Sequence, residues 1–313
     1  MKKIEFAVKL IMLFAISFVF AVCIVMPQYR AGYMAAFIDK LEREENILEP
    51  KIILMGDSNV AYGIDSVMIE KELGMPVVNM GMHGGLGETF CMDIAKEGIR
   101  QGDLIVIVPG VYYYEPKLAD GTLAWLLLEN DLSLLQRVDK RDYSTLLKGY
   151  PAYLKRALAL WKSQAGNLAD DAPNIQDRNS FNEYGDIRSV GSTNIMEGGY
   201  IQEVYPVNIC YDLMDYFNEY NRYVQKKGAT MVLAAPPFME TILENGYTTV
   251  EGLEENLMQA LDFPVISDYK DYVYPQEYFY NTNLHLNDKG KEIRTMQLIE
   301  DIREWMNDEG GKK

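Results

Sequence analysis

A serine and a histidine far apart in the chain have settings that fit nucleophilic chemistry. Ser58 belongs to the tetrapeptide Gly-Asp-Ser-Asn at residues 56–59, directly after the apolar run 52–55. His285 is one of only two histidines and lies in the sequence Asn-Leu-His-Leu-Asn at residues 283–287. A serine hydroxyl is a weak nucleophile and needs a base to accept its proton, a task that imidazole performs well. The pair predicts a serine enzyme that transfers acyl groups; a simple Gly-Asp-Ser turn is the alternative.

The elements around this pair predict how the chain would bring it together. Short β-rich runs alternate with helix-like segments, which predicts an α/β fold with three layers, α/β/α, around a central parallel sheet. The expected strands are 51–55, 76–80, 103–108, 230–234 and 264–267, and the expected helices are 66–73, 88–101, 208–227, 250–261 and 288–306. Because the carboxyl ends of parallel strands share one edge, Ser58 and His285 should meet there.

Two glycine-rich or polar loops are expected at the same edge. Residues 81–87 follow the second strand and contain His83, which either lines the pocket or lies on the surface. Residues 110–115 follow the third strand. A dinucleotide-binding role for the first loop fails on spacing, because Phe90 stands where the third glycine should be.

Residues 116–207 interrupt the alternation of strands and helices. Segments 123–135 and 143–161 are helix-like, and 170–199 is polar. We expect an insertion that packs over the active edge as a lid or as an acceptor-binding element.

The N-terminus predicts a membrane anchor. Lys2, Lys3 and Lys9 precede residues 10–26, which carry no charge. Counted from Phe6, such a helix would be about 30 Å long, enough to cross a bilayer. A cleaved signal peptide is the alternative, but no Ala-x-Ala site follows. The expected order is therefore a cytoplasmic tip and transmembrane helix in 1–30, a linker in 31–50, and an extracytoplasmic domain in 51–313.

Composition limits the partners and cofactors. The chain has 313 residues, 48% of them hydrophobic, and a formal net charge of −16. That charge argues against nucleic acid as a partner and against electrostatic docking on anionic lipid. Cys91 and Cys210 lie on apolar helix positions and are expected to be free thiols, with a disulfide as the alternative. No zinc-ligand spacing is present, so we expect no metal and no cofactor.

Three sequence blocks carry a family resemblance. Residues 56–59 with Gly63 resemble the first block of the SGNH/GDSL hydrolase superfamily, residues 79–84 its second, and His285 its last. The resemblance implies a flavodoxin-like fold, Ser58 as the nucleophile and His285 as the base. It also implies an oxyanion hole that uses the N–H groups of Ser58 and Gly84.

The anchor and the Asn-x-His-Leu-Asn sequence resemble one branch of this superfamily. That branch comprises membrane-anchored envelope proteins such as the D-alanine-transfer protein of lipoteichoic acid and alginate O-acetylation proteins. The resemblance implies transfer of a small acyl group to an envelope polysaccharide or teichoic-acid-like polymer. It also implies a multi-pass membrane O-acyltransferase as the partner. A plain secreted esterase is an alternative activity.

Two departures from the family pattern concern the site. Tyr112 stands where the third block has an asparagine that donates to the oxyanion, so Asn59 or a tyrosine hydroxyl would have to replace it. The aspartate that usually holds the histidine is missing, and Asn281 is the expected substitute, with Asp268 as the alternative. These departures keep a second hypothesis open, namely a non-catalytic envelope binding or scaffold protein.

Overall fold

A parallel sheet of four strands forms the centre of the molecule. The computed structural model describes residues 2–20, 26, 29–163, 177–196, 208–243 and 245–310. The strands follow the order β2-β1-β3-β4 and comprise β1 (Ile52–Gly56), β2 (Val77–Asn79), β3 (Leu104–Val108) and β4 (Thr230–Leu233). All three pairings are parallel, so the four carboxyl ends share one edge. The predicted α/β fold with a central parallel sheet is confirmed.

The fifth predicted strand, residues 264–267, shrinks to a single parallel bridge between Val265 and Leu233 beside β4. Pro264 has no N–H to continue a ladder. The hydroxyl of Ser267 donates to Asp301 on α10 and accepts the N–H of Ala235. A separate parallel pair, β5 (Phe238–Met239) and β6 (Val273–Tyr274), follows β4 in the chain.

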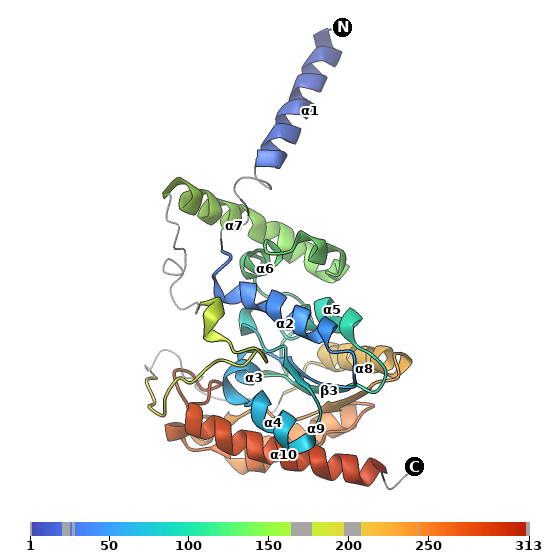
Figure 1. Cartoon of the computed structure of the whole chain (residues 1–313), viewed down its shortest axis with the longest axis vertical. Coiled ribbons are helices and arrows are strands. Elements are labelled where there is room, and N and C mark those ends of the chain that lie inside the picture. Colours follow the sequence, from blue (N-terminus) through green and yellow to red (C-terminus); the bar gives the residue numbers. More distant parts are fainter. Residues whose placement is uncertain are drawn as a thin grey trace.

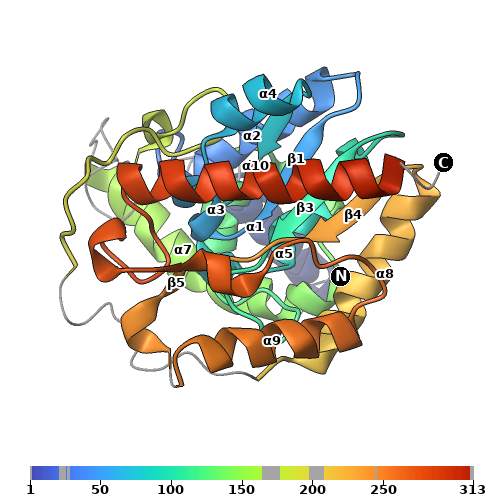
Figure 2. The same cartoon turned by 90° about the horizontal axis from the view of Figure 1, so that it is seen from below.

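Helices cover both faces of the sheet, as Figures 1 and 2 show. Alternate strand residues point to opposite faces. Ile52 and Leu54 pack in one buried cluster with residues of α3 (Ser58–Gly63), α4 (Ser66–Leu73) and α10 (Asp288–Gly310). Ile53 and Met55 pack in the other cluster with α5 (Phe90–Ala95), α8 (Tyr211–Lys226) and α9 (Tyr247–Ala260). Short 3-10 turns complete the connections: η2 (Tyr33–Ala35), η3 (Gly84–Leu86), η4 (Lys96–Gly98), η5 (Leu132–Gln136), η6 (Lys140–Asp142), η7 (Arg178–Ser180), η9 (Glu240–Ile242), η10 (Tyr269–Tyr272) and η11 (Gln276–Tyr278).

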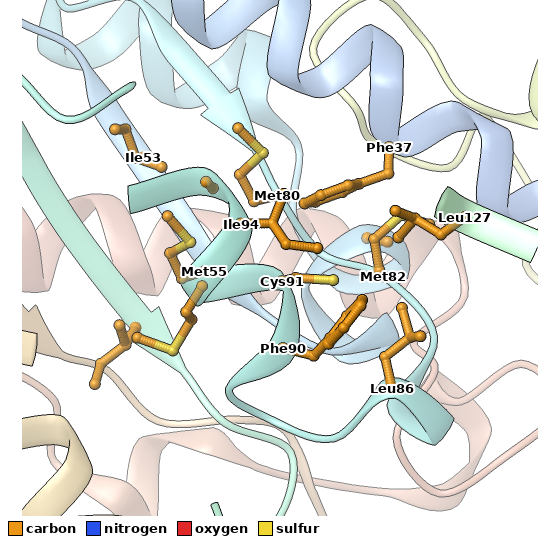
Figure 3. Packing of buried hydrophobic residues seen from close by; sticks show 14 of the residues in the cluster. Phe37, Ile53, Met55, Met80, Met82, Leu86, Phe90, Cys91, Ile94 and Leu127 are labelled. Atoms are coloured by element: carbon orange, nitrogen blue, oxygen red, sulfur yellow. The ribbon is translucent and has the colours of Figure 1, made fainter. Parts of the chain in front are cut away.

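The segment expected to be a linker is part of the folded domain. Residues 31–50 contain η2 and α2 (Ala36–Asn46), and Phe37 of α2 is fully buried beside Met80 and Met82 (Figure 3). The ammonium group of Lys40, also buried, donates to the carbonyl oxygens of Gly81 and Gly185 at 2.5 and 2.8 Å. Burial lowers the pKa of Lys40 to about 7. A solvated stalk would bury none of these groups, so the domain begins before residue 51.

The insertion forms a helical hairpin of α6 (Gly121–Leu128) and α7 (Tyr143–Ser163). The two helices approach closely where Gly149 of α7 meets Gly121, because neither residue has a side chain. Of the expected polar segment 170–199, residues 177–196 are described and contain only η7, whereas the remainder lies outside the described residues.

The N-terminal helix α1 (Lys2–Phe20) differs from the expected anchor. It carries Lys2, Lys3, Glu5 and Lys9, and among the described residues no helix has the length and apolarity that crossing a membrane requires. The charge-free run 10–26 continues past Phe20. Residues 21–25, which include Cys23, lie outside the described residues.

The contact between Gly149 and Gly121 can be tested by substitution. A glycine inside a helix is normally about 1 kcal/mol worse than alanine. At Gly149, however, a Cβ would lie 2.3 Å from the Gly121 carbonyl carbon, and backbone yields little. Overpacking costs about 1–3 kcal/mol, so Gly149→Ala should destabilise the protein in urea unfolding. The control Ala159→Gly, at an exposed position of α7, measures helix propensity alone; stabilisation by Gly149→Ala would contradict the close packing.

Candidate active site

Ser58 is the first residue of α3, immediately after β1 ends. The turn between them is held by Asp57, whose Oδ1 accepts the backbone N–H and the side-chain N–H of Asn59 at 2.7 and 2.6 Å. This is the hydrogen bond of a helix N-cap. The hydroxyl of Ser58 consequently lies at the carboxyl edge of the sheet, partly exposed.

His285 reaches Ser58 from the far end of the chain. Its Nε2 lies 2.7 Å from Ser58 Oγ although 227 residues separate the two in sequence. Its Nδ1 lies 2.8 Å from Asn281 Oδ1. An amide oxygen only accepts, so Nδ1 carries the proton and Nε2 is left to accept from the serine hydroxyl. The three side chains thus form a Ser-His-Asn chain of hydrogen bonds.

The environment keeps the His285 ring neutral. Tyr62 of α3 stacks on it, with ring centroids 4.0 Å apart and an angle of 8° between the planes. Loss of hydration, together with a smaller effect of the nearby His83, lowers the pKa of His285 to about 3. No carboxylate offsets these effects, because the partner of Nδ1 is an amide. His285 is therefore a neutral ring at neutral pH.

Glycines allow the second loop to approach the nucleophile turn. A Cβ on Gly81 would lie 2.6 Å from the Ala61 nitrogen and 2.8 Å from the Asp57 carbonyl oxygen. A Cβ on Gly84 would lie 3.4 Å from Asp57 Oδ2. Gly84 therefore packs beside the residue that precedes Ser58.

Asn59 and Tyr112, two of the side chains that could replace the third oxyanion donor, are engaged elsewhere. Asn59 is fully buried, and its side-chain N–H groups donate to Asp57 and to the Val108 carbonyl oxygen. The phenol of Tyr112 is also fully buried and shares a 2.9 Å hydrogen bond with that of Tyr269. Neither group faces the Ser58 hydroxyl.

Asp268 likewise does not hold the histidine. It caps η10 by accepting the N–H of Lys270 at 3.0 Å. Thr282, where the family pattern has aspartate, accepts the backbone N–H of His285 at 3.2 Å and so shapes the histidine loop.

His83 was expected either to line the pocket or to lie on the surface. In the structure it is half-buried and caps η3. Its Nδ1 accepts the N–H of Gly85 at 2.9 Å, which leaves the ring proton on Nε2. Loss of hydration lowers the pKa of His83. The two histidines of the protein therefore carry their protons on opposite nitrogens.

Buried charge behind the site was not foreseen from the sequence. Arg294 of α10 is fully buried and donates to the carbonyl oxygen and Oδ1 of Asn59 at 2.8 and 2.9 Å. Glu88 accepts the N–H of Val111 at 3.3 Å. Burial raises the pKa of Glu88 well above its usual range, and the carboxylate of Asp57 raises it further. Burial also raises the pKa of Asp57, an effect that the hydrogen bonds from Asn59 and the charge of Arg294 oppose.

Residues 177–196 of the insertion form hydrogen bonds with residues on the β2 side of the site and with α10, the helix that follows His285. Asp186 accepts from the Ser66 hydroxyl at 2.5 Å and from the Asn79 amide at 2.8 Å. Asp288, at the start of α10, accepts from the N–H groups of Val190 and Gly191. This part of the insertion therefore connects the end of β2 to the helix that follows His285.

Comparisons with known proteins do not assign the chain to a family. No protein-family model matches it, and no curated protein does. Within the described part of the chain, no group of His, Cys, Asp and Glu side chains could hold a metal ion, and Cys91 and Cys210 are both free. The geometry of the site therefore has to carry the functional argument.

The histidine tautomers give a direct test of this geometry. We expect the imidazole ¹⁵N spectrum to show one Nδ1–H ring, His285, and one Nε2–H ring, His83. Because the pKa of His285 is about 3, its signals should stay those of a neutral ring when the pH falls through 6.5, the pKa of an unperturbed histidine. His83→Gln assigns the two rings. A His285 ring that titrates near pH 6.5, or that carries its proton on Nε2, would contradict the contacts with Asn281 and Ser58.

Proposed function

We propose that the protein transfers acyl groups through an acyl-Ser58 intermediate. The observation that carries the proposal is the 2.7 Å contact between Ser58 Oγ and His285 Nε2, with Asn281 holding Nδ1. A base within hydrogen-bond reach of the nucleophile, itself oriented by a third group, is the arrangement that activates a serine. The same three-part arrangement, built from Cys, His and Asn, is used by papain-like proteases.

The proposed reaction proceeds in two balanced halves. Ser58 Oγ attacks the carbonyl carbon of an ester or thioester while its proton passes to His285 Nε2. The carbonyl oxygen gains negative charge, which the N–H groups of Ser58 and Gly84 stabilise. His285 then gives the proton to the leaving group, and acyl-Ser58 remains. In the second half an acceptor hydroxyl loses its proton to His285 and attacks the acyl carbon. The bond between that carbon and Ser58 Oγ then breaks, and His285 returns the proton to Oγ, which regenerates both residues.

The acceptor class rests on the resemblance to SGNH/GDSL envelope proteins and not on a contact in the site. A carbohydrate or polyol hydroxyl of an envelope polymer is the proposed acceptor, and acetyl or another small acyl group the proposed cargo. A multi-pass membrane O-acyltransferase is the proposed partner. With water as the acceptor, the same steps would make the protein an esterase.

A binding or scaffold role is the second candidate, and a specific observation favours it. An amide partner offers no negative charge to stabilise the imidazolium that each half-reaction forms. In a serine protease the change from aspartate to asparagine costs about 10⁴-fold in turnover. A chain that only binds a polymer would not need that charge.

Labelling by a fluorophosphonate separates the two candidates. The full chain should form a covalent adduct at Ser58, because the probe reacts with a base-activated serine. Ser58→Ala should abolish the adduct. The control Ser133→Ala changes an exposed serine in η5 and should label like the wild type. Equal labelling of the wild type and Ser58→Ala, or none in either, would favour the binding role.

The neutral partner of His285 gives a second prediction. Asn281→Asp places a carboxylate 2.8 Å from Nδ1, which stabilises the imidazolium and raises the pKa of His285. We expect the labelling rate to rise, by about 10⁴-fold at most, and the acid limb of its pH profile to move to higher pH. Asn281→Ala, the matched control, should lower the rate instead, because the ring loses its orientation. An unchanged pH profile in Asn281→Asp would show that residue 281 does not act through the histidine.

A further inference from the structure

Helix α7 has a positive net charge although the chain as a whole is acidic. Residues of α7 include Lys148, Lys155, Arg156 and Lys162 and no acidic side chain, whereas the whole chain has a net charge of −16. All four cations are exposed. The acidic average therefore conceals one strongly basic face.

These cations have no ionic partner within the described part of the chain. Exposed arginines elsewhere do, for example Arg222 with Asp262 and Arg303 with Glu72. No such pair involves the four cations of α7. Their charge is thus available to a ligand outside the chain.

The spacing arranges basic and apolar side chains in adjacent rows. Lys148, Lys155 and Lys162 are seven residues apart, which is close to two helical turns and puts them on one face. Leu147 and Trp161, 70% and 41% exposed, lie one position before the first and last of these lysines. The opposite face packs on the domain through buried residues such as Leu146, Tyr153 and Ala157. The exposed face of α7 is therefore both cationic and apolar.

A second apolar surface lies beside this face. The rings of Phe20 and Trp161 meet edge to face, with centroids 5.4 Å apart. Figure 1 shows α1 projecting from the domain next to α7. Large apolar side chains are exposed along α1: Ile4, Phe6, Val8, Leu10, Ile11, Met12, Leu13, Phe14, Ile16, Phe18, Val19 and Phe20.

We propose that the exposed face of α7 docks on the surface of an anionic lipid bilayer. Lysines above apolar side chains suit the headgroup region, since their stems lie along the apolar layer and their ammonium groups reach the phosphates. Tryptophan is enriched at the same depth. A soluble polyanion would match the charges but would leave Leu147, Trp161 and the surface of α1 in water.

The net charge of the chain does not oppose this docking strongly. At physiological ionic strength, charges are screened over about 8 Å. Acidic side chains farther than this from the bilayer therefore contribute little, and the nearby cations of α7 contribute most. The sequence-based expectation that the acidity excludes anionic lipid applies to the chain average and not to this face.

The proposal is tested by sedimenting the full chain with vesicles. One set contains phosphatidylcholine alone, and the other contains phosphatidylcholine and phosphatidylglycerol at about 7:3. The anionic lipid should tighten binding at low salt, and added salt should remove the gain. Replacing the four cations of α7 by Gln should weaken binding to the anionic vesicles by about 100-fold or more. Leu147→Gln should weaken binding to both sets.

A matched control keeps the result specific. Gln at Lys71, Lys226, Lys227 and Lys289 removes the same four charges from exposed positions outside α7 and should leave the anionic gain intact. Unchanged melting temperatures show that both variants fold. Equal losses in the two variants would overturn the proposal in favour of net charge. Release from the vesicles by soluble polyphosphate at low salt, with equally tight polyphosphate binding, would overturn it in favour of a polymer.

Discussion

The buried carboxylate of Asp57 organises the site. It is 5% exposed and accepts two hydrogen bonds from Asn59, which Arg294 in turn holds from α10. Gly84 and Gly110 lie against it, and a Cβ on Gly110 would come within 2.2 Å of Asp57 Oδ2. The ends of β1, β2 and β3 are therefore packed around one charged group. This packing fixes the position of Ser58. The residues that form it lie where they would not contact a substrate.

The histidine side of the site is held by weaker, neutral contacts. Asn281, Thr282 and Tyr62 orient the His285 ring through an amide oxygen, a hydroxyl and a stacked phenol. These contacts fix the orientation of the His285 ring, but none of them stabilises a positive charge on it. In the proposed reaction the barrier would include the cost of forming an uncompensated imidazolium, which suits an activated donor such as a thioester better than an ordinary ester. Slow hydrolysis would also spare acyl-Ser58 for an acceptor hydroxyl.

The sequence predicted the elements that form locally and missed contacts that depend on the whole fold. Strong alternation placed β1, β3 and α4 within a residue or so, and the strand-edge argument brought Ser58 near His285.

Asn59 was expected to face the oxyanion because its neighbour does. Its inward orientation depends on Arg294, 235 residues away, which periodicity cannot reveal. Segment 264–267 was predicted to be a strand from its apolar character, but it forms one bridge, because Pro264 has no N–H to extend the ladder. Residues 31–50 were expected to be a linker, whereas the buried Lys40 is satisfied by two carbonyl groups from distant loops.

The separation of Ser58 from His285 has a consequence for the order in which the protein matures. During synthesis the nucleophile leaves the ribosome 227 residues before its base, and Arg294 follows later still. Contacts of such long range form only when nearly the whole domain is available. Until α10 packs on the sheet, Asn59 lacks the contacts with Arg294. Under the proposed function, we therefore expect Ser58 to become reactive only after α10 has docked.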